Sequence, residues 1–336
     1  MTLSQPTLSH AMRDLRFAQE LVDLVVSQLR NDRSSLRACC LLSKTWRIAA
    51  QPHLFKLVKL SPNSLMAAEA ALDEDQFSDD EESEGDGSDD EEAESESDCD
   101  DEEKVFRRLV KLFGDFLITA SPLIKESVKY LWISGEINDA GEPYSLRRGV
   151  LRRLVEVLPR LDTLRLDMLA VSVDEAEPMP LDSLRSLTFV MQDFTEPAVD
   201  GFLIALSLFP GLKELDFQLS DAAFSLSPTT AFSKVGAFGS QLVKVTQRQH
   251  QHEEFTRMFG PDDEIECASY DFVTGLLRHI KSSAANLTPL RNLDVEAIFP
   301  LDMDVDPSEL LEELGSGLHH LVLRTSWGDT DSLIGE

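Results

Sequence analysis

A short apolar pattern recurs between residues 128 and 323, and it constrains the fold more than any other feature of this sequence. A Leu is followed by two variable residues, a second Leu, one further residue and an apolar residue, as in Leu161–Leu166 and Leu184–Phe189. The first occurrence begins with Val128 instead of Leu. The residues at the fourth position are Leu131, Leu164, Leu187, Leu215, Leu293 and Leu321, with spacings of 33, 23, 28, 78 and 28 residues.

This pattern at a period of 20–29 residues is typical of leucine-rich repeats, in which each unit is a short strand, a turn and a helix. Helical apolar patterns lie between the expected strands, at 146–158, 198–208, 270–285 and 307–314. No such unit can bury its apolar face alone, so stacked units predict an α/β fold with an irregular, curved solenoid over 104–336. The alternative is an irregular α/β domain with a few similar strand starts.

The interval of 78 residues between Leu215 and Leu293 is about three periods of 26. It therefore predicts two degenerate units in this part of the chain. Gln241–Val245 is a candidate for one of them.

An acidic run separates the repeats from the N-terminal region. Asp73–Glu103 contains 20 acidic residues and neither Lys nor Arg, in a chain whose formal net charge is −30. Such a segment cannot bury enough apolar surface to offset the entropy of ordering, so we expect 61–103 to be a disordered acidic linker. Five serines have an acidic residue three positions later, the pattern that acidophilic kinases of the casein-kinase type favour. These candidate phosphorylation sites are Ser78, Ser83, Ser88, Ser95 and Ser97.

Two basic clusters follow the acidic run. Apolar residues from Val105 to Leu117 recur at helical spacing, and the same predicted helix carries a basic stripe at Lys104, Arg107, Arg108 and Lys111. A second cluster lies at Arg147, Arg148, Arg152 and Arg153 on the next predicted helix. The first cluster could hold the acidic run against the body of the protein or could be a solvated face. The second could bind an acidic ligand, the acidic run or nothing, and the sequence leaves these alternatives open.

Charge and composition exclude several classes of function. The strongly acidic field repels phosphate and disfavours nucleic acid as a partner. No apolar run approaches the roughly 18 residues of a membrane span, so we expect no membrane contact. The N-terminal residues lack a basic region followed by an apolar one, so we expect no signal peptide. The four Cys show no paired spacing, which suits a reducing compartment and predicts a cytoplasmic or nuclear location.

The first sixty residues predict three short helices, at about 19–30, 34–40 and 43–50. Apolar residues occupy two sides of the first of these helices. Because so short a region forms only a thin core, an additional apolar side indicates a surface for a partner.

The same residues resemble an F-box of the kind found in mushroom-type fungal proteins. The resemblance covers about 15–60 and rests on three spaced elements, Phe17–Leu29, Asp32–Trp46 and Gln51–Phe55. One position departs from the family, because Ala18 stands where a Pro usually begins the first helix.

The resemblance implies docking on a Skp-type adaptor and, through it, on a cullin. Carried over position by position, the expected adaptor contacts are Ala18, Glu20, Leu21, Leu24, Val25, Leu29, Leu36, Leu42 and Trp46. The alternative for Leu24, Leu36 and Trp46 is that they pack only inside the helical unit.

No catalytic constellation, cofactor motif or metal site is evident in the sequence. Asp302, Asp304, Asp306 and Glu313 match ligand positions of a calcium-binding EF-hand loop, but Pro307 occupies the position that requires Gly. Since proline fixes φ near −65°, this segment is better interpreted as the start of a helix. We therefore expect no metal, no cofactor and no enzymatic activity.

Together these observations predict a substrate-recognition subunit of a Skp–cullin–F-box type ubiquitin ligase. A flexible N-terminus at 1–14 would precede the F-box at 15–60, the acidic linker at 61–103 and the repeat domain at 104–336. The repeat domain would bind a target protein that the sequence does not identify. The alternative is an acidic-tract binding protein or chaperone for basic proteins such as histones, with the acidic run as its binding element.

Overall fold

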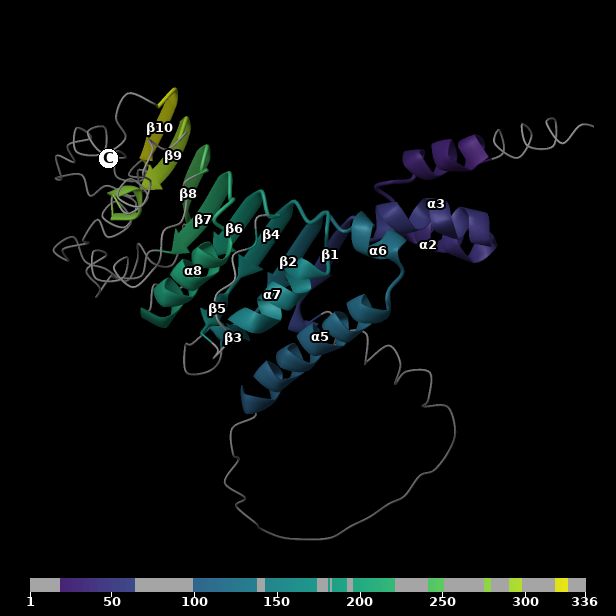
Figure 1. The fold of residues 1–336 in the computed structure, drawn as a ribbon, viewed down its shortest axis with the longest axis horizontal. Coiled ribbons are helices and arrows are strands. Elements are labelled where there is room, and N and C mark those ends of the chain that lie inside the picture. Colours follow the sequence, from purple (N-terminus) through teal and green to yellow (C-terminus); the bar gives the residue numbers. More distant parts are fainter. Residues whose placement is uncertain are drawn as a thin grey trace, which may run out of the picture.

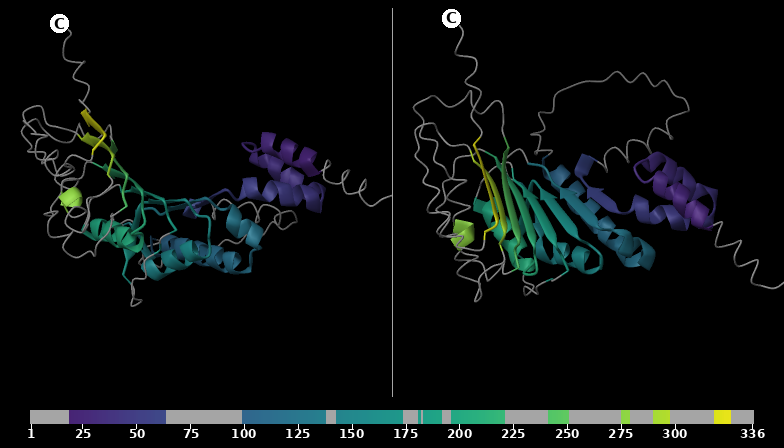
Figure 2. Two further views of the ribbon diagram at one scale, coloured as in Figure 1. Left: turned by 45° about the horizontal axis from the view of Figure 1, so that its top comes forward. Right: turned by 90° about the horizontal axis from the view of Figure 1, so that it is seen from above.

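The computed structural model describes residues 19–63, 99–137, 143–173, 181, 183–191, 196–220, 241–250, 275–278, 290–297 and 318–325. These residues form a small helical unit joined to a large sheet that carries helices along one side (Figures 1 and 2). The mixed helix-and-sheet class that the repeated pattern predicts is confirmed, and the sheet strands are parallel. No helix within the described residues is both long enough and apolar enough to span a membrane.

Eight parallel strands make up the main sheet, in the order β1-β2-β4-β6-β7-β8-β9-β10. The strands follow one another in chain order across the sheet, with only the short parallel pair β3 (Tyr144–Arg147) and β5 (Leu169–Ser172) set apart. The main strands are β1 (Leu57–Leu60), β2 (Tyr130–Ser134), β4 (Thr163–Asp167), β6 (Ser186–Val190), β7 (Glu214–Ser220), β8 (Lys244–His250), β9 (Asn292–Ala297) and β10 (His320–Thr325).

The fourth residues of the repeated pattern form one row across this sheet. Leu131 pairs with Leu164, and the row continues through Leu187 and Leu215 towards β10. A second row, two residues further along each strand, includes Ile133, Leu166, Phe189 and Phe217. Side chains alternate between the two faces of a strand, so both rows point to the same face, and the residues named from β2 to β7 are buried there.

One strand, β8, fills the interval between Leu215 and Leu293. Val245 pairs with Leu215 on one side and with Leu293 on the other. The expectation of two degenerate units is therefore wrong for the sheet, because β8 is hydrogen-bonded directly to both β7 and β9. Among the described residues of this interval, β8 is the one strand in the sheet.

Helices cover the face on which the apolar rows lie (Figure 2). They are α5 (Cys99–Thr119), α6 (Pro122–Ser127), α7 (Arg148–Glu156) and α8 (Glu196–Leu208). α7 and α8 match the expected helices at 146–158 and 198–208, except that residues 146 and 147 end β3. Of the expected helix at 270–285 the structure describes only 275–278, which are helical, and the one at 307–314 lies outside the described residues.

The helical unit comprises a helix over 19–28, α2 (Arg33–Leu42) and α3 (Lys44–Leu54). Side chains cap both labelled helices: Asp32 accepts from Ser35 N at 3.1 Å and Ser43 Oγ accepts from Trp46 N at 3.4 Å. The unit has its own core of Val26, Leu36, Cys39 and Ala50, separate from the core under the sheet.

The expected end of the F-box at 60 and the expected end of the linker at 103 both differ from the structure. β1 pairs with β2, so 57–60 belongs to the sheet and not to the helical unit. α5 begins at Cys99, so the last five residues of the acidic run are helical and not disordered. Carboxylates are favourable in the first turn of a helix, which explains how acidic residues 100–103 enter α5. Residues 64–98 lie outside the described residues.

Candidate partner-binding surfaces

Large apolar side chains are exposed on the outside of the helical unit. The exposed fraction is 57% for Leu24, 84% for Leu41 and 66% for Leu42. Leu21, Val25 and Ile48 are also exposed. A unit with four buried core residues thus presents six exposed large apolar residues. Apolar surface gathered on one small unit is a feature of protein-interaction sites.

The unit's first helix divides its apolar residues between two sides. Val26 is buried and Val22 and Leu29 pack against it, whereas Leu21, Leu24 and Val25 face outward. The residues on the inner side pack in the unit's own core. Among the described residues, the outer side does not pack in that core, so its apolar surface is exposed.

The structure places the predicted adaptor contacts in three groups. Those exposed on the unit's surface are Glu20, Leu21, Leu24, Val25 and Leu42. Leu29 and Trp46 are partly buried and pack against the unit's core. Leu36 is fully buried, so its assignment as a surface contact is wrong and its side chain packs internally. Ala18 lies outside the described residues, as do the five candidate phosphoserines.

Sequence reasoning missed Leu41 and Ile48 as surface residues. In α2 the inward stripe runs through Leu36, Cys39 and Cys40. Leu41 lies outside that stripe, so helical spacing accounts for its exposure once packing has selected the inward side of α2. Ile48 lies similarly between the core-facing Trp46 and Ala49 of α3.

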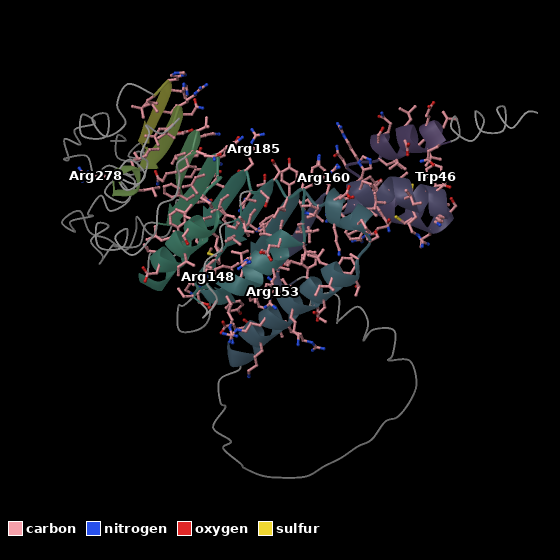
Figure 3. The ribbon with its side chains drawn as sticks, viewed as in Figure 1. Trp46, Arg148, Arg153, Arg160, Arg185 and Arg278 are labelled. Carbon is pink, nitrogen blue, oxygen red and sulfur yellow. The ribbon has the colours of Figure 1, made fainter. Side chains whose placement is uncertain are left out.

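The helical unit is attached to the first strand of the sheet. Arg33 Nη2 donates to Leu57 O at 2.7 Å, and the rings of Phe55 and Phe116 stack with centroids 6.3 Å apart. α3 also contacts α6. These contacts hold the exposed apolar residues at the end of the molecule opposite β10, where Trp46 is labelled in Figure 3.

A second candidate surface is the face of the sheet opposite the helices. Its central row carries Lys59, Trp132, Arg165, Thr188, Asp216, Thr246, Asp294 and Val322. Lys59 Nζ lies 4.0 Å and Arg165 Cζ 4.5 Å from the centroid of the Trp132 ring, close enough for cation–π contacts. Arg165 Nε also donates to Asp167 at 2.8 Å. Trp132 Nε1 is buried without a hydrogen-bond partner among the described residues.

Two ion pairs join neighbouring strands elsewhere on this face. Arg248 lies 3.6 Å from Asp216, and Arg185 Nη2 lies 2.9 Å from Glu214. Burial raises the pKa of the Asp216 carboxyl, against the opposing effects of Arg248, Lys244 and Arg165. The row at Lys59, Trp132 and Arg165 is therefore the part of the face that combines a large aromatic surface with clustered cations.

Comparison with known proteins identifies no relative. The chain matches no family model, no curated protein and no solved structure. Among the described side chains, no three His, Cys, Asp or Glu residues converge as metal ligands.

Proposed function

We propose that this protein is a substrate-recognition subunit of a Skp–cullin–F-box type ubiquitin ligase. The helical unit would bind a Skp-type adaptor, and the sheet domain would hold a target protein. In this proposal the chain performs no chemistry itself but brings the target close to the ubiquitin-transfer machinery.

The main observation in support of this proposal is the exposed apolar face of the helical unit. Leu24, Leu41 and Leu42 are more than half exposed. Burying them would add apolar contacts to a unit whose own core is small. Burial of apolar surface contributes about 25 cal/mol per Å2, so a docked partner would stabilise this face. The F-box resemblance over 15–60 indicates which class of partner to test first.

The second arm of the proposal is a leucine-rich-repeat-like solenoid over the sheet domain. Two features support it: the strands follow chain order in parallel, and the pattern's fourth residues lie in one row. We assign target binding to the sheet face opposite the helices, centred on Trp132 with Lys59 and Arg165. Trp and Arg are the residue types most enriched among binding hot spots.

Co-purification with a Skp-type adaptor at moderate salt tests the first arm. The variant Leu42→Asp places a charge on the exposed apolar face without disturbing the unit's core. We expect the wild-type chain to form a stoichiometric complex and the variant to lose it.

Val173→Asp is the matched control, because Val173 is 64% exposed at the end of β5, away from the helical unit. It should retain adaptor binding. A folded wild-type chain that does not bind the adaptor contradicts the proposal. Equal loss of binding in Leu42→Asp and Val173→Asp also contradicts it, because the effect would then not belong to the helical face.

A further inference from the structure

A groove with a volume of about 490 Å3 lies between α5 and α7. It is on the side of the sheet that carries the helices, apart from both surfaces described above. Phe106 and Val110 of α5 and Leu154 of α7 give it an apolar floor, and residues of β3 and β5 complete its wall. Figure 3 labels Arg148 and Arg153 on α7, beside α5. This size is typical of sites that bind a small molecule or a short peptide segment.

The rim of the groove is cationic. Arg107, Lys111, Arg147 and Arg153 line it, against the carboxylates of Asp115 and Glu156. Glu156 pairs with Arg152 at 2.7 Å. Within the described parts of the chain, Lys111 and Arg147 are exposed and form no ion pair. The groove thus joins the two basic clusters of the sequence into one positive site, on a chain whose formal net charge is −30.

Carboxylates are already bound at the edge of this groove. Tyr144 Oη donates to Glu102 Oε2 at 3.0 Å, and Ser145 N donates to Glu103 Oε1 at 3.2 Å. The same Glu103 oxygen accepts from Arg107 at 2.8 Å. Glu102 and Glu103 are the last two residues of the acidic run. The end of the run is therefore fixed on α5 and β3, the two elements that carry the groove cations Lys111 and Arg147.

We propose that the α5–α7 groove is a binding site for acidic peptide, and that its occupant is residues 73–98 of the same chain. These residues contain 16 Asp and Glu side chains and join α5 at Cys99. The apolar floor lowers the local dielectric constant, which strengthens ion pairs at the rim relative to those in open solvent.

The segment is long enough to reach Lys111 in the groove. Lys111 is 12 residues beyond Cys99, a distance of about 18 Å along a helix. About six extended residues span that distance, and 26 residues are available between Asp73 and Asp98. Attachment at Cys99 also gives the segment an effective concentration on the order of millimolar at the groove, which a free acidic peptide does not reach.

Limited proteolysis of the full-length chain tests this inference. A glutamyl endopeptidase is added at an ionic strength of about 0.05 M, and the cleavage rate at sites within 73–98 is followed by mass spectrometry. The variant carrying Lys111→Gln and Arg147→Gln should be cleaved in this segment roughly threefold to tenfold faster than wild type. Raising the ionic strength to about 0.5 M should remove the difference, because salt screens the ion pairs.

Two further variants make the result specific to the groove. Lys213→Gln with Arg291→Gln removes the same charge from exposed positions before β7 and β9, and should be cleaved at the wild-type rate. Lys111→Arg with Arg147→Lys keeps the charge and should retain protection. Circular dichroism checks that every variant is folded.

Equal cleavage in the wild type and in the groove variant overturns the proposal. Protection that disappears on dilution also overturns it, because the segment would then occupy the groove of a second copy. Adaptor binding through the helical unit is measured separately, so failure of this proposal leaves that one intact.

Discussion

The helical unit and the sheet domain differ in how far their leucine side chains are buried. In the sheet, the pattern's fourth-position leucines at 131, 164, 187 and 215 are at most 1% exposed. In the helical unit, Leu24, Leu41 and Leu42 are more than half exposed. Sheet leucines are buried because each strand stacks its row on the next and helices cover it. Three short helices provide no second layer, so part of their apolar surface stays exposed. The two regions thus differ in how completely they bury their own apolar residues, and the proposed function assigns the exposed surface to an adaptor.

The largest expected effect comes from the sheet core. Phe189 is fully buried, and its ring packs edge-on against Phe202 with centroids 5.2 Å apart. Phe189→Ala should lower the free energy of unfolding by about 3–5 kcal/mol, because it removes apolar contacts and leaves a cavity. Denaturant unfolding followed by circular dichroism measures this change.

The corresponding change in the helical unit is Leu36→Ala, which should act locally. Hydrogen exchange should show lost protection in α2 and α3 while the sheet amides stay protected, since the two cores are separate. Equal loss of protection in both regions would show that they fold as one cooperative unit, and the comparison would fail.

A smaller effect, of opposite sign, is expected at Gln247. This side chain is fully buried in a row of apolar residues between Phe217 and Val295, and neither of its polar atoms has a hydrogen-bond partner among the described residues. Gln247→Leu should raise the free energy of unfolding by about 1–3 kcal/mol, because the desolvation penalty of the amide is removed. A lower thermal midpoint for Gln247→Leu would indicate that the amide has a stabilising role.

A weaker pH effect is expected in the helical unit. Hydrogen bonds from Ser34 and Ser35 lower the pKa of Asp32 from 3.8 to about 2. Because the folded pKa lies below the unfolded one, the stabilising contribution is complete above about pH 4 and is lost as the pH falls towards 2. Thermal unfolding between these pH values should show a shallower decline for Asp32→Asn, which keeps the cap but does not titrate. An unchanged decline would assign the acid sensitivity to other groups.

The smallest stability effect is expected at Leu42. Because its side chain is 66% exposed, Leu42→Asp should change the free energy of unfolding by no more than about 0.5 kcal/mol. The same substitution is expected to abolish adaptor binding. A large loss of stability would mean that Leu42 supports the unit itself, and the contrast between the two regions would be weaker than proposed.

Strands β1 and β8 belong to the sheet but match the repeated leucine pattern only in part. Phe55, Val58 and Leu60 occupy the first, fourth and sixth positions of the pattern without its leading leucines, and they lead into and form β1. Leu242 and Val245 occupy the first and fourth positions for β8, but Gln247 stands at the sixth. A search for apolar character instead of leucine would have found β1. The sequence did indicate Gln241–Val245 as a candidate unit, and β8 begins within it at Lys244, although the polar Gln247 interrupts the pattern.

The sequence by itself determined which residues point to the sheet core. Side chains alternate between the two faces of a strand, and with a repeat of 23–33 residues only one strand register places all the leucines on the same face. It also determined that the N-terminal helices carry more apolar surface than their own core needs. Only the tertiary structure decided which apolar residues those are: it buries Leu36 and exposes Leu41. It also decided that the two basic clusters meet across one groove. Helical periodicity orders residues around a single axis, but the packing of one helix against another selects the side that faces the core.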